Sequence, residues 1–293
     1  MSDYIIATSS TCDLPRPYRE EHGIPSISYT YTIGDQVFED DCREENRQKI
    51  YEGMRKGDRL KTSMITEYSY TEFFESLLSQ GKDVIYLDMS QKMSSSYANA
   101  DRAAEEVRQK FPDRKLYMMD TRCISGGLGL LVTNMVSRME SGMDFEQVVA
   151  WGEENKLKIA HRFTVDDLIY LKEGGRCSTP AALVGSLLSV KPVLYVPDAG
   201  TLDVVKKVRG RKKALEAIYD GVKSDLEQVD TNGLEIRILQ ADCREDAELV
   251  RSWIQRDFPQ TGPIEISNLG VVIGAHCGPG LFTIFYLCQQ RKP

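Results

Sequence analysis

Short apolar runs rich in β-branched residues alternate with longer segments of helical character through the first half of the chain. The predicted strands are Tyr4–Thr8, Asp83–Met89 and Lys115–Met119, and the predicted helices are Arg43–Lys56, Tyr70–Leu78, Tyr97–Phe111 and a segment from near Gly126 to about Glu140. An alternating run, Ile24–Ile33, returns after Gly34-Asp35 as Gln36–Phe38, which is typical of a β-hairpin. Strands that alternate with helices predict a parallel sheet covered by helices.

From about Lys158 onward the pattern mixes hairpins with helices. Two apolar runs, Ser189–Pro197 and Thr201–Val208, flank Asp198-Ala199-Gly200 and predict a hairpin. The other predicted strands are Lys158–Phe163, Leu234–Ala241 and Pro263–Ile266, and the other predicted helices are Val165–Leu171, Pro180–Leu188, Ala214–Leu226 and Glu245–Phe258. Since 293 residues exceed the usual single domain, we expect an N-terminal α/β domain over residues 1–157 and a C-terminal α+β domain with a mixed sheet over 158–293.

The stretch Asn268–Phe282 carries one of only three histidines in the chain. An apolar run reaches Ile273, Gly278-Pro279-Gly280 follows His276, and a second apolar run begins at Leu281. This pattern predicts a strand, a tight loop and a second strand, with His276 at the loop. The imidazole is then either a site residue or a cap that bonds to the backbone of the turn. Adjacent residues of a strand face opposite ways, so Cys277 is not expected to pair with His276 as a nucleophile.

Hydroxyl side chains gather where the predicted parallel strands end. The loops at these ends are Thr8–Thr11, Ser90–Ser96 and Asp120–Ser125, and a further loop over Lys61–Met64 adds Thr62 and Ser63. In parallel sheets, ligands bind beyond the carboxyl ends of the strands. Hydroxyls at helix N-termini can hold an anionic head group, although ordinary N-capping also explains each of them singly.

The run Lys206–Lys213 is basic at six of its eight positions, in a chain whose net charge is −7. We place it near the start of a helix, where cations oppose the helix dipole. It is either a solvated face or a surface for an anionic partner, such as a phosphate, a nucleic acid or an acidic protein face. The overall acidity argues against nucleic-acid binding by the protein as a whole.

Several classes of protein are excluded or disfavoured. No apolar run approaches the roughly 20 residues of a membrane helix, and Met1-Ser2-Asp3-Tyr4 does not resemble a signal segment, so we expect a cytoplasmic protein without membrane insertion. The seven cysteines are scattered without a Cys-x-x-Cys pair, which favours reduced thiols and no metal site. Gly126-Gly127-Leu128-Gly129 lacks the spacing of a nucleotide-binding loop, so we interpret its glycines as allowing close helix packing.

Four polar residues stand out against strongly apolar surroundings: Thr62, Ser94, Arg176 and His276. Arg176 follows Gly174-Gly175, which predicts a tight turn at the end of a helix. An amphiphile would satisfy both features, with its tail among apolar residues and its head among hydroxyls and the imidazole. Each buried CH₂ of such a tail adds about 0.8 kcal/mol, and a buried carboxylate requires hydrogen bonds.

With these motifs, the sequence resembles the DegV family, which includes the fatty-acid-binding subunits of bacterial fatty acid kinase. The matching segments follow the order of the family and span nearly the whole chain: Ile6–Pro15, Lys61–Ser63, Met93–Tyr97, Asp120-Thr121, Asp167–Arg176, Lys191-Pro192, Lys206–Lys213 and Gly274–Gly280. Three positions depart from the usual motifs: Ser9 stands where an Asp is common, Ser94-Ser95-Ser96 where Ser-Gly-Thr is common, and Cys277 where a Thr is common.

The resemblance implies a fatty acid buried between two domains. Its carboxylate would meet a group of polar side chains: Thr62, Ser63, Ser94, Ser95, Arg176 and His276. Gly278 and Gly280 would support the histidine loop. The protein itself would have no catalytic residue, metal or cofactor, and a separate ATP-dependent kinase subunit would phosphorylate the carboxylate to an acyl phosphate. That subunit would dock on the basic run, at Lys206, Lys207, Arg209, Arg211 and Lys212.

Two other functions remain open from the residues alone. A stand-alone hydrolase could use Ser94 with His276 as base, although no third triad member or Gly-x-Ser-x-Gly motif is present. A nucleic-acid-binding regulator could use residues 206–213, although no aromatic residues are interleaved with the charges. Transient membrane contact, without insertion, also stays open.

Overall fold

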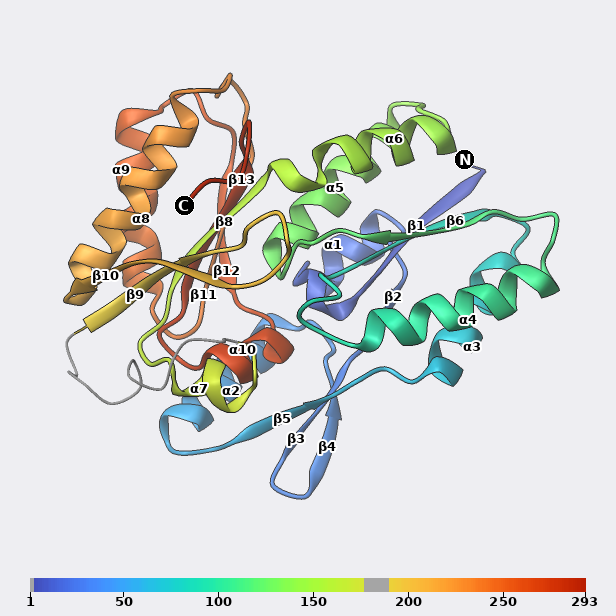
Figure 1. The fold of residues 1–293 in the computed structure, drawn as a ribbon, viewed down its shortest axis with the longest axis horizontal. Helices are drawn as coiled ribbons and strands as arrows, with labels where there is room; N and C mark the ends of the chain where they lie inside the picture. The colour runs from blue at the N-terminus through green and yellow to red at the C-terminus, as the bar shows by residue number, and fades with distance from the viewer. Residues whose placement is uncertain (1–2, 177–189) are drawn as a thin grey trace.

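The computed structural model describes residues 3–176 and 190–293, and Figure 1 shows their arrangement. Four parallel strands form the first sheet, in the order β2-β1-β6-β7. Their bounds are β1 (Tyr4–Ser9), β2 (Ser26–Ile27), β6 (Asp83–Asp88) and β7 (Leu116–Asp120). Helices α3 (Glu67–Leu78) and α4 (Ser96–Lys110) cover one face, and α5 (Gly126–Glu140) and α6 (Phe145–Asn155) cover the other. The prediction of a parallel, helix-covered sheet is confirmed.

The second sheet has six strands in the order β10-β9-β8-β13-β11-β12. Only β11 and β12 pair in parallel; the other neighbours are antiparallel, so the sheet is mixed, as predicted. The strands are β8 (Ile159–Thr164), β9 (Val190–Tyr195), β10 (Asp203–Arg209), β11 (Ile236–Gln240), β12 (Ile264–Asn268) and β13 (Phe282–Leu287). Helices α8 (Arg211–Leu226) and α9 (Arg244–Asp257) cover its outer face through a core that includes Ile218, Val250 and Ile284.

Helix α5 packs against strands of both sheets and so joins them into one core. The glycines at its start make this packing possible. A Cβ on Gly127 would lie 2.1 Å from Nε2 of His161 on β8, and a Cβ on Gly129 would lie 2.5 Å from the carbonyl oxygen of Cys12. The interpretation of these glycines as packing residues is confirmed.

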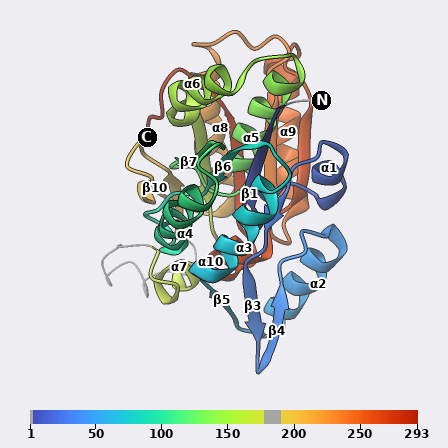
Figure 2. The same ribbon diagram turned by 90° about the vertical axis from the view of Figure 1, so that its right-hand side faces the viewer.

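A third, antiparallel sheet has the order β4-β3-β5 and projects from the body (Figure 2). Its hairpin, β3 (Thr30–Ile33) with β4 (Gln36–Glu39), matches the prediction. The predicted loop over Lys61–Met64 is wrong, because Leu60–Ser63 forms strand β5, in which Thr62 pairs with Tyr31. This segment has only one apolar residue at its start, so its strand conformation comes from the cross-strand partner and not from a pattern of its own.

The predicted first strand of the Asn268–Phe282 stretch is also wrong, whereas the second apolar run, from Leu281, forms strand β13 as predicted. Residues Val271–Cys277 form a short helix, α10, and His276 lies in its last turn. The helix is buried on nearly all sides, so its apolar run has no periodicity that would distinguish it from a buried strand. Gly274 faces Tyr51, whose hydroxyl oxygen would lie 2.1 Å from a Cβ at that position.

The remaining elements are short or lie between the sheets: η1 (Ser10–Cys12), α1 (Arg16–Glu21), α2 (Glu44–Arg55), η2 (Lys156–Lys158) and α7 (Ile169–Glu173). The predicted helix Pro180–Leu188 falls outside the described residues. Within residues 3–176 and 190–293, no helix combines the length and apolar character needed to cross a bilayer.

Candidate functional site

A mainly apolar cavity is lined by both the parallel-sheet half of the chain and the mixed-sheet half. Its empty volume is about 820 Å³, including the open mouth. Apolar side chains make up most of the wall: Met64, Met89, Met93, Ile124, Phe163, Leu171, Val196, Leu202, Leu269, Val272, Ile273, Leu281 and Phe285. Such a wall suits an apolar ligand.

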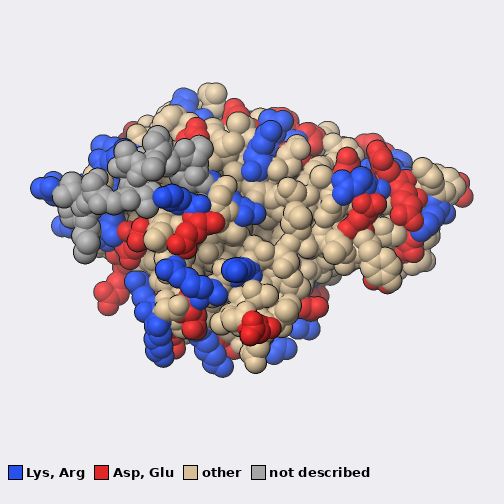
Figure 3. Space-filling model, turned by 60° about the horizontal axis from the view of Figure 1, so that its bottom comes forward, with Lys and Arg blue, Asp and Glu red and all other residues tan. Residues whose placement is uncertain are grey.

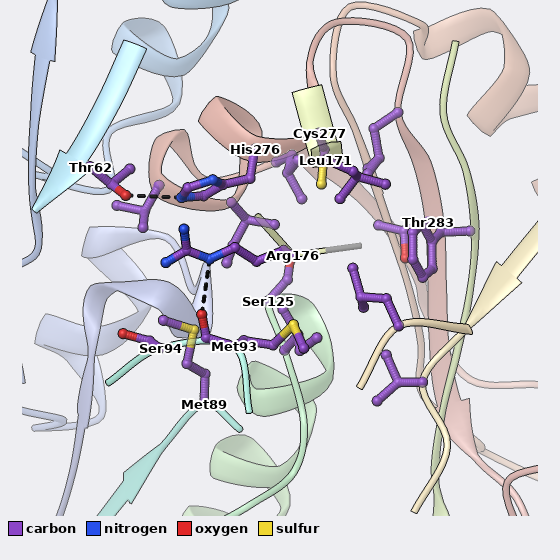
Figure 4. A pocket seen from close by; sticks show the side chains of 18 of the residues that line it. Thr62, Met89, Met93, Ser94, Ser125, Leu171, Arg176, His276, Cys277 and Thr283 are labelled. Carbon is purple, nitrogen blue, oxygen red and sulfur yellow. Dashed lines mark hydrogen bonds between the residues drawn. The ribbon is translucent and has the colours of Figure 1, made fainter. Parts of the chain in front are cut away.

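One end of the cavity is polar, and four different segments of the chain build it (Figure 4). Thr62 comes from β5, Ser94 from the turn before α4, Arg176 from the turn after α7, and His276 from the end of α10. The Thr62 hydroxyl and Nε2 of His276 are 2.9 Å apart and hydrogen-bonded. The four polar residues singled out in the sequence are therefore neighbours in space.

Arg176 is positioned by a helix-ending turn. Its N–H donates to the carbonyl of Leu171, and the N–H of Gly175 donates to that of Lys172, while Gly175 has a φ of +68°. This pair of bonds with a left-handed glycine is a Schellman motif. Gly174 has a second role, because a Cβ there would lie 2.3 Å from Nδ1 of His276. The Gly-Gly-Arg sequence thus brings the guanidinium and the imidazole together.

The charge of Arg176 is not neutralised by any of the described residues. Its Nε donates to the backbone carbonyl of Met93 at 3.1 Å, and its Nη1 donates to that of Gly174. No carboxylate of the described chain forms an ion pair with it. Residues 3–176 and 190–293 therefore use two of its five N–H groups and leave the others for an anion in the cavity.

His276 is neutral at physiological pH. Burial, and secondly the positive charge of Arg176, lower the pKa of His276 to about 4. A neutral imidazole can donate or accept a hydrogen bond without adding a second positive charge. The polar end of the cavity therefore holds one fixed cation and several neutral hydrogen-bonding groups.

We expect an NMR titration of the empty protein to give a pKa near 4 for His276. The unfolded pKa is about 6.5, so between these values the unfolded chain binds a proton that the folded chain does not. His276 therefore removes stability as the pH falls through this window. A bound carboxylate should raise the pKa of His276, because its negative charge favours the imidazolium. The His276→Gln variant assigns the signal, and a pKa near 6.5 without ligand would contradict this description.

The two neighbouring serines of the predicted head-group site differ. Ser94 is buried at the cavity wall, where its Oγ lies 3.3 Å from the hydroxyl of Tyr29. Ser63 also lines the cavity, whereas Ser95 is exposed at the start of α4 and does not line it. The sequence does not indicate Tyr29 as a site residue, because an aromatic residue next to a hairpin is not by itself typical of a binding site.

Gly278 and Gly280 hold the loop after α10 close to its neighbours. Both have positive φ, 77° and 87°. A Cβ on Gly278 would lie 2.3 Å from the ring of Tyr170, and one on Gly280 would lie 2.0 Å from a carboxylate oxygen of Asp166. Glycine is required at both positions for the backbone conformation and for the space.

Two nucleophile hypotheses lack the necessary geometry. Burial raises the pKa of Cys277 to about 12, so the side chain is a thiol and not the reactive thiolate. The Ser94 hydroxyl contacts Tyr29 and the N–H of Ser96, while His276 bonds to Thr62. No hydrogen bond therefore joins Ser94 to His276 within the described chain, and the hydrolase alternative gains no support.

Ser9, which stands where an Asp is common in the motif, lies away from the cavity. Its hydroxyl donates to Asp88 at 2.8 Å, and two buried tyrosines, Tyr70 and Tyr86, donate to the other oxygen of the same carboxylate. Burial raises the pKa of Asp88. A second carboxylate at position 9 would meet Asp88 directly, so serine is the compatible partner for this network.

The basic run divides into two environments. Lys206, Lys207 and Arg209 are exposed on the edge strand β10, and Lys212 is exposed on α8. Arg211 is instead only partly exposed and pairs with Asp246 at 2.8 Å and with Asp166 at 3.6 Å. Figure 3 shows basic side chains at the left-hand end of the molecule, where β10 and α8 lie in Figure 1, with acidic side chains among them. The placement of the whole run at a helix start is wrong for residues 206–209.

A family model described as an uncharacterised protein of the DegV family matches residues 4–289. The DegV domain-containing protein CPE0026 of Clostridium perfringens is 36% identical over 294 residues, with both chains fully covered. The chain belongs to the DegV family. This membership confirms the resemblance that the sequence motifs indicate.

Solved DegV structures share the fold over nearly their whole length. A DegV lipid-binding protein of Thermotoga maritima is 27% identical, with both chains fully covered and a TM-score of 0.85. A fatty-acid-binding DegV protein of Thermus thermophilus is 26% identical over 97% of this chain and 99% of its own, with a TM-score of 0.86. The cavity of the present DegV chain can thus be compared with proteins whose ligands are lipids.

Proposed function

We propose that this DegV protein binds a long-chain fatty acid in the cavity and presents its carboxylate to a separate ATP-dependent kinase subunit in the cytoplasm. The carboxylate would lie at the polar end with Arg176, His276, Thr62, Ser63 and Ser94, and the chain would extend along the apolar wall. Ser95 is not part of the proposed carboxylate site, because its side chain faces solvent. The protein would contribute no chemistry of its own.

The observation that carries the proposal is a guanidinium, at one end of a mainly apolar cavity, that forms no ion pair with any carboxylate of the described residues. A cation without an anionic partner favours an anionic ligand, and the apolar wall favours a hydrocarbon chain. Since Thr62 and Ser94 belong to the first half of the chain and Arg176 and His276 to the second, the ligand would lie between the two proposed domains, 1–157 and 158–293. The fatty-acid-binding protein of Thermus thermophilus has the same fold and supports this class of ligand.

Native mass spectrometry on the purified protein tests the proposal. We expect a co-purifying long-chain fatty acid and, after delipidation, uptake of one added fatty acid per chain. Protein that is reproducibly empty and takes up no added fatty acid would rule out the carrier function. Incubation of the loaded protein with the kinase subunit and ATP then tests presentation separately, through formation of the acyl phosphate.

The exposed part of the basic run should serve kinase docking. The triple variant Lys206→Glu, Lys207→Glu and Arg209→Glu is expected to lower kinase-dependent phosphorylation about tenfold or more, because reversal of charge at an interface slows association. Fatty-acid binding should stay within about twofold, since none of these residues lines the cavity. Equal losses in both assays would contradict the docking role.

Arg211 provides a structural contrast to these three residues. Its replacement by Glu would place a carboxylate against Asp166 and Asp246, so we expect loss of stability in a denaturant titration. Lys212 is exposed and should behave like the residues of β10. We therefore propose a docking surface made of Lys206, Lys207, Arg209 and Lys212, without Arg211.

A further inference from the structure

The end of the cavity away from Arg176 contains a polar side chain, Thr283, on strand β13 (Figure 4). Side chains of this strand alternate between two surroundings. Phe282 and Ile284 pack into the core beneath α8 and α9, whereas Thr283 and Phe285 line the cavity. Thr283 therefore brings a hydroxyl to the wall of the cavity.

The Thr283 hydroxyl has no hydrogen-bonding partner among the described residues. The side chain is only 4% exposed. Its hydroxyl oxygen nevertheless keeps some accessible surface. The hydroxyl oxygen of Thr164 on the neighbouring strand, by contrast, is fully enclosed and has no partner. Because Thr283 is buried apart from the surface that lines the cavity, the accessible surface of its oxygen faces the cavity.

The other polar side chains near this end are already engaged. His161 has its Nδ1 2.8 Å from the carbonyl of Ile159, and its Nε2 accepts the N–H of Ile124 at 3.1 Å. Burial, with the nearby charge of Arg291, lowers the pKa of His161 well below its ordinary value, so the ring is neutral. Ser125 donates its hydroxyl hydrogen to the buried carboxylate of Asp13 and keeps only acceptor capacity. Thr283 is thus the group here with both donor and acceptor unused.

An unsubstituted hydrocarbon chain would displace water from the cavity and leave the Thr283 hydroxyl without a hydrogen-bonding partner. A buried hydroxyl that loses water and gains no hydrogen bond is unfavourable. A ligand with an oxygen atom on its chain would supply the missing partner. Sites built to hydrogen-bond a ligand hydroxyl discriminate against analogues that lack it.

We propose that the cavity selects long-chain fatty acids that carry a hydroxyl or keto group on the chain, with Thr283 as the specificity-determining residue. This inference rests on the proposed function, since it takes the carboxylate to be held at Arg176. In Figure 4, Thr283 and the Thr62–His276 pair lie on opposite sides of the cavity. The oxygen of the ligand would therefore be remote from its carboxylate, in the middle or distal part of the chain.

The test uses the delipidated full-length protein with stearic acid and a panel of its positional hydroxy isomers. At least one mid-chain or distal isomer should bind about tenfold tighter than stearic acid, as expected for one added buried hydrogen bond. Thr283→Val has a similar shape without the hydroxyl, and it should reduce this preference to about one through weaker binding of the preferred hydroxy isomer. Thr283→Ser should retain the preference.

The outcomes distinguish this inference from the proposed function. If no isomer binds tighter than stearic acid to the unmodified protein, or if Thr283→Val retains the preference, Thr283 does not select the ligand and the inference is overturned. If neither stearic acid nor any isomer binds, the carrier function itself fails. The panel on the unmodified protein needs no variant, so a poorly folding Thr283→Val would not prevent a decision.

Discussion

Replacement of Arg176 by glutamine is expected to raise the dissociation constant for a long-chain fatty acid by roughly 30- to 5,000-fold, which corresponds to about 2–5 kcal/mol. Arg176 is the one lining residue of the described chain that carries a full charge, because both histidines in the wall have lowered pKa values. Without it, a carboxylate would have to enter a mainly apolar cavity with hydrogen bonds from neutral groups alone. The cost of burying an uncompensated charge is then borne by the complex.

Fluorescence displacement or calorimetry on delipidated protein measures this effect. Arg59→Gln is a matched control, because Arg59 is an exposed arginine on the segment before β5 that stacks over Tyr170 and does not line the cavity. It should bind fatty acid within about twofold of the unmodified protein. Comparable affinities for the Arg176→Gln and Arg59→Gln variants would mean that the carboxylate is held elsewhere.

Replacement of His276 by alanine should separate binding from phosphorylation. We expect affinity for fatty acid to fall about tenfold or less, since one neutral hydrogen-bonding group is lost. Acyl phosphate formation by the kinase should fall about 100- to 1,000-fold, because fixed hydrogen-bonding groups matter most where charge develops during transfer. The imidazole is well suited to this role, since Thr62 and Gly174 hold it in place beside Arg176.

Thr62→Val gives a graded comparison for this experiment. It removes the hydrogen bond to Nε2 of His276 and leaves the ring, so the loss of phosphorylation should be smaller than for His276→Ala. Both variants should keep the unfolding behaviour of the parent near neutral pH. Unchanged binding and unchanged phosphorylation in His276→Ala would remove His276 from the functional site.

The local pattern was sufficient for most of the fold. Runs such as Asp83–Met89 are buried over nearly their whole length in the structure, and a local capping box of Asp144 with Gln147 starts α6. The class of each sheet follows largely from the order of the elements, because consecutive strands that pair in parallel need a crossover connection, usually a helix, whereas strands joined by short turns pair antiparallel. These features depend on neighbours in the sequence, and the sequence displays them.

The residues of the polar end were also recognisable one by one. Arg176 and His276 lie next to glycines, Thr62 and Ser94 lie in segments with further hydroxyl side chains, and the motifs around all four point to the DegV family. The residue types alone do not predict that these four side chains meet in space, because the residues come from four separate parts of the chain. The turn at Gly174-Gly175 is an exception, since its glycines indicate its geometry directly.

By itself, the sequence determined most of the elements, the class of the two large sheets, the family and four of the residues that meet at the cavity. Only the tertiary structure decided that Leu60–Ser63 is a strand, that Val271–Cys277 is a helix, and that Ser95 points away while Tyr29 and Thr283 face inward. The physical reason is common to all of these. Each depends on a partner far away in the chain, such as β3 for β5, Tyr51 for Gly274 or the opposite cavity wall for Thr283, and no local pattern of hydrophobic and polar residues records such a partner.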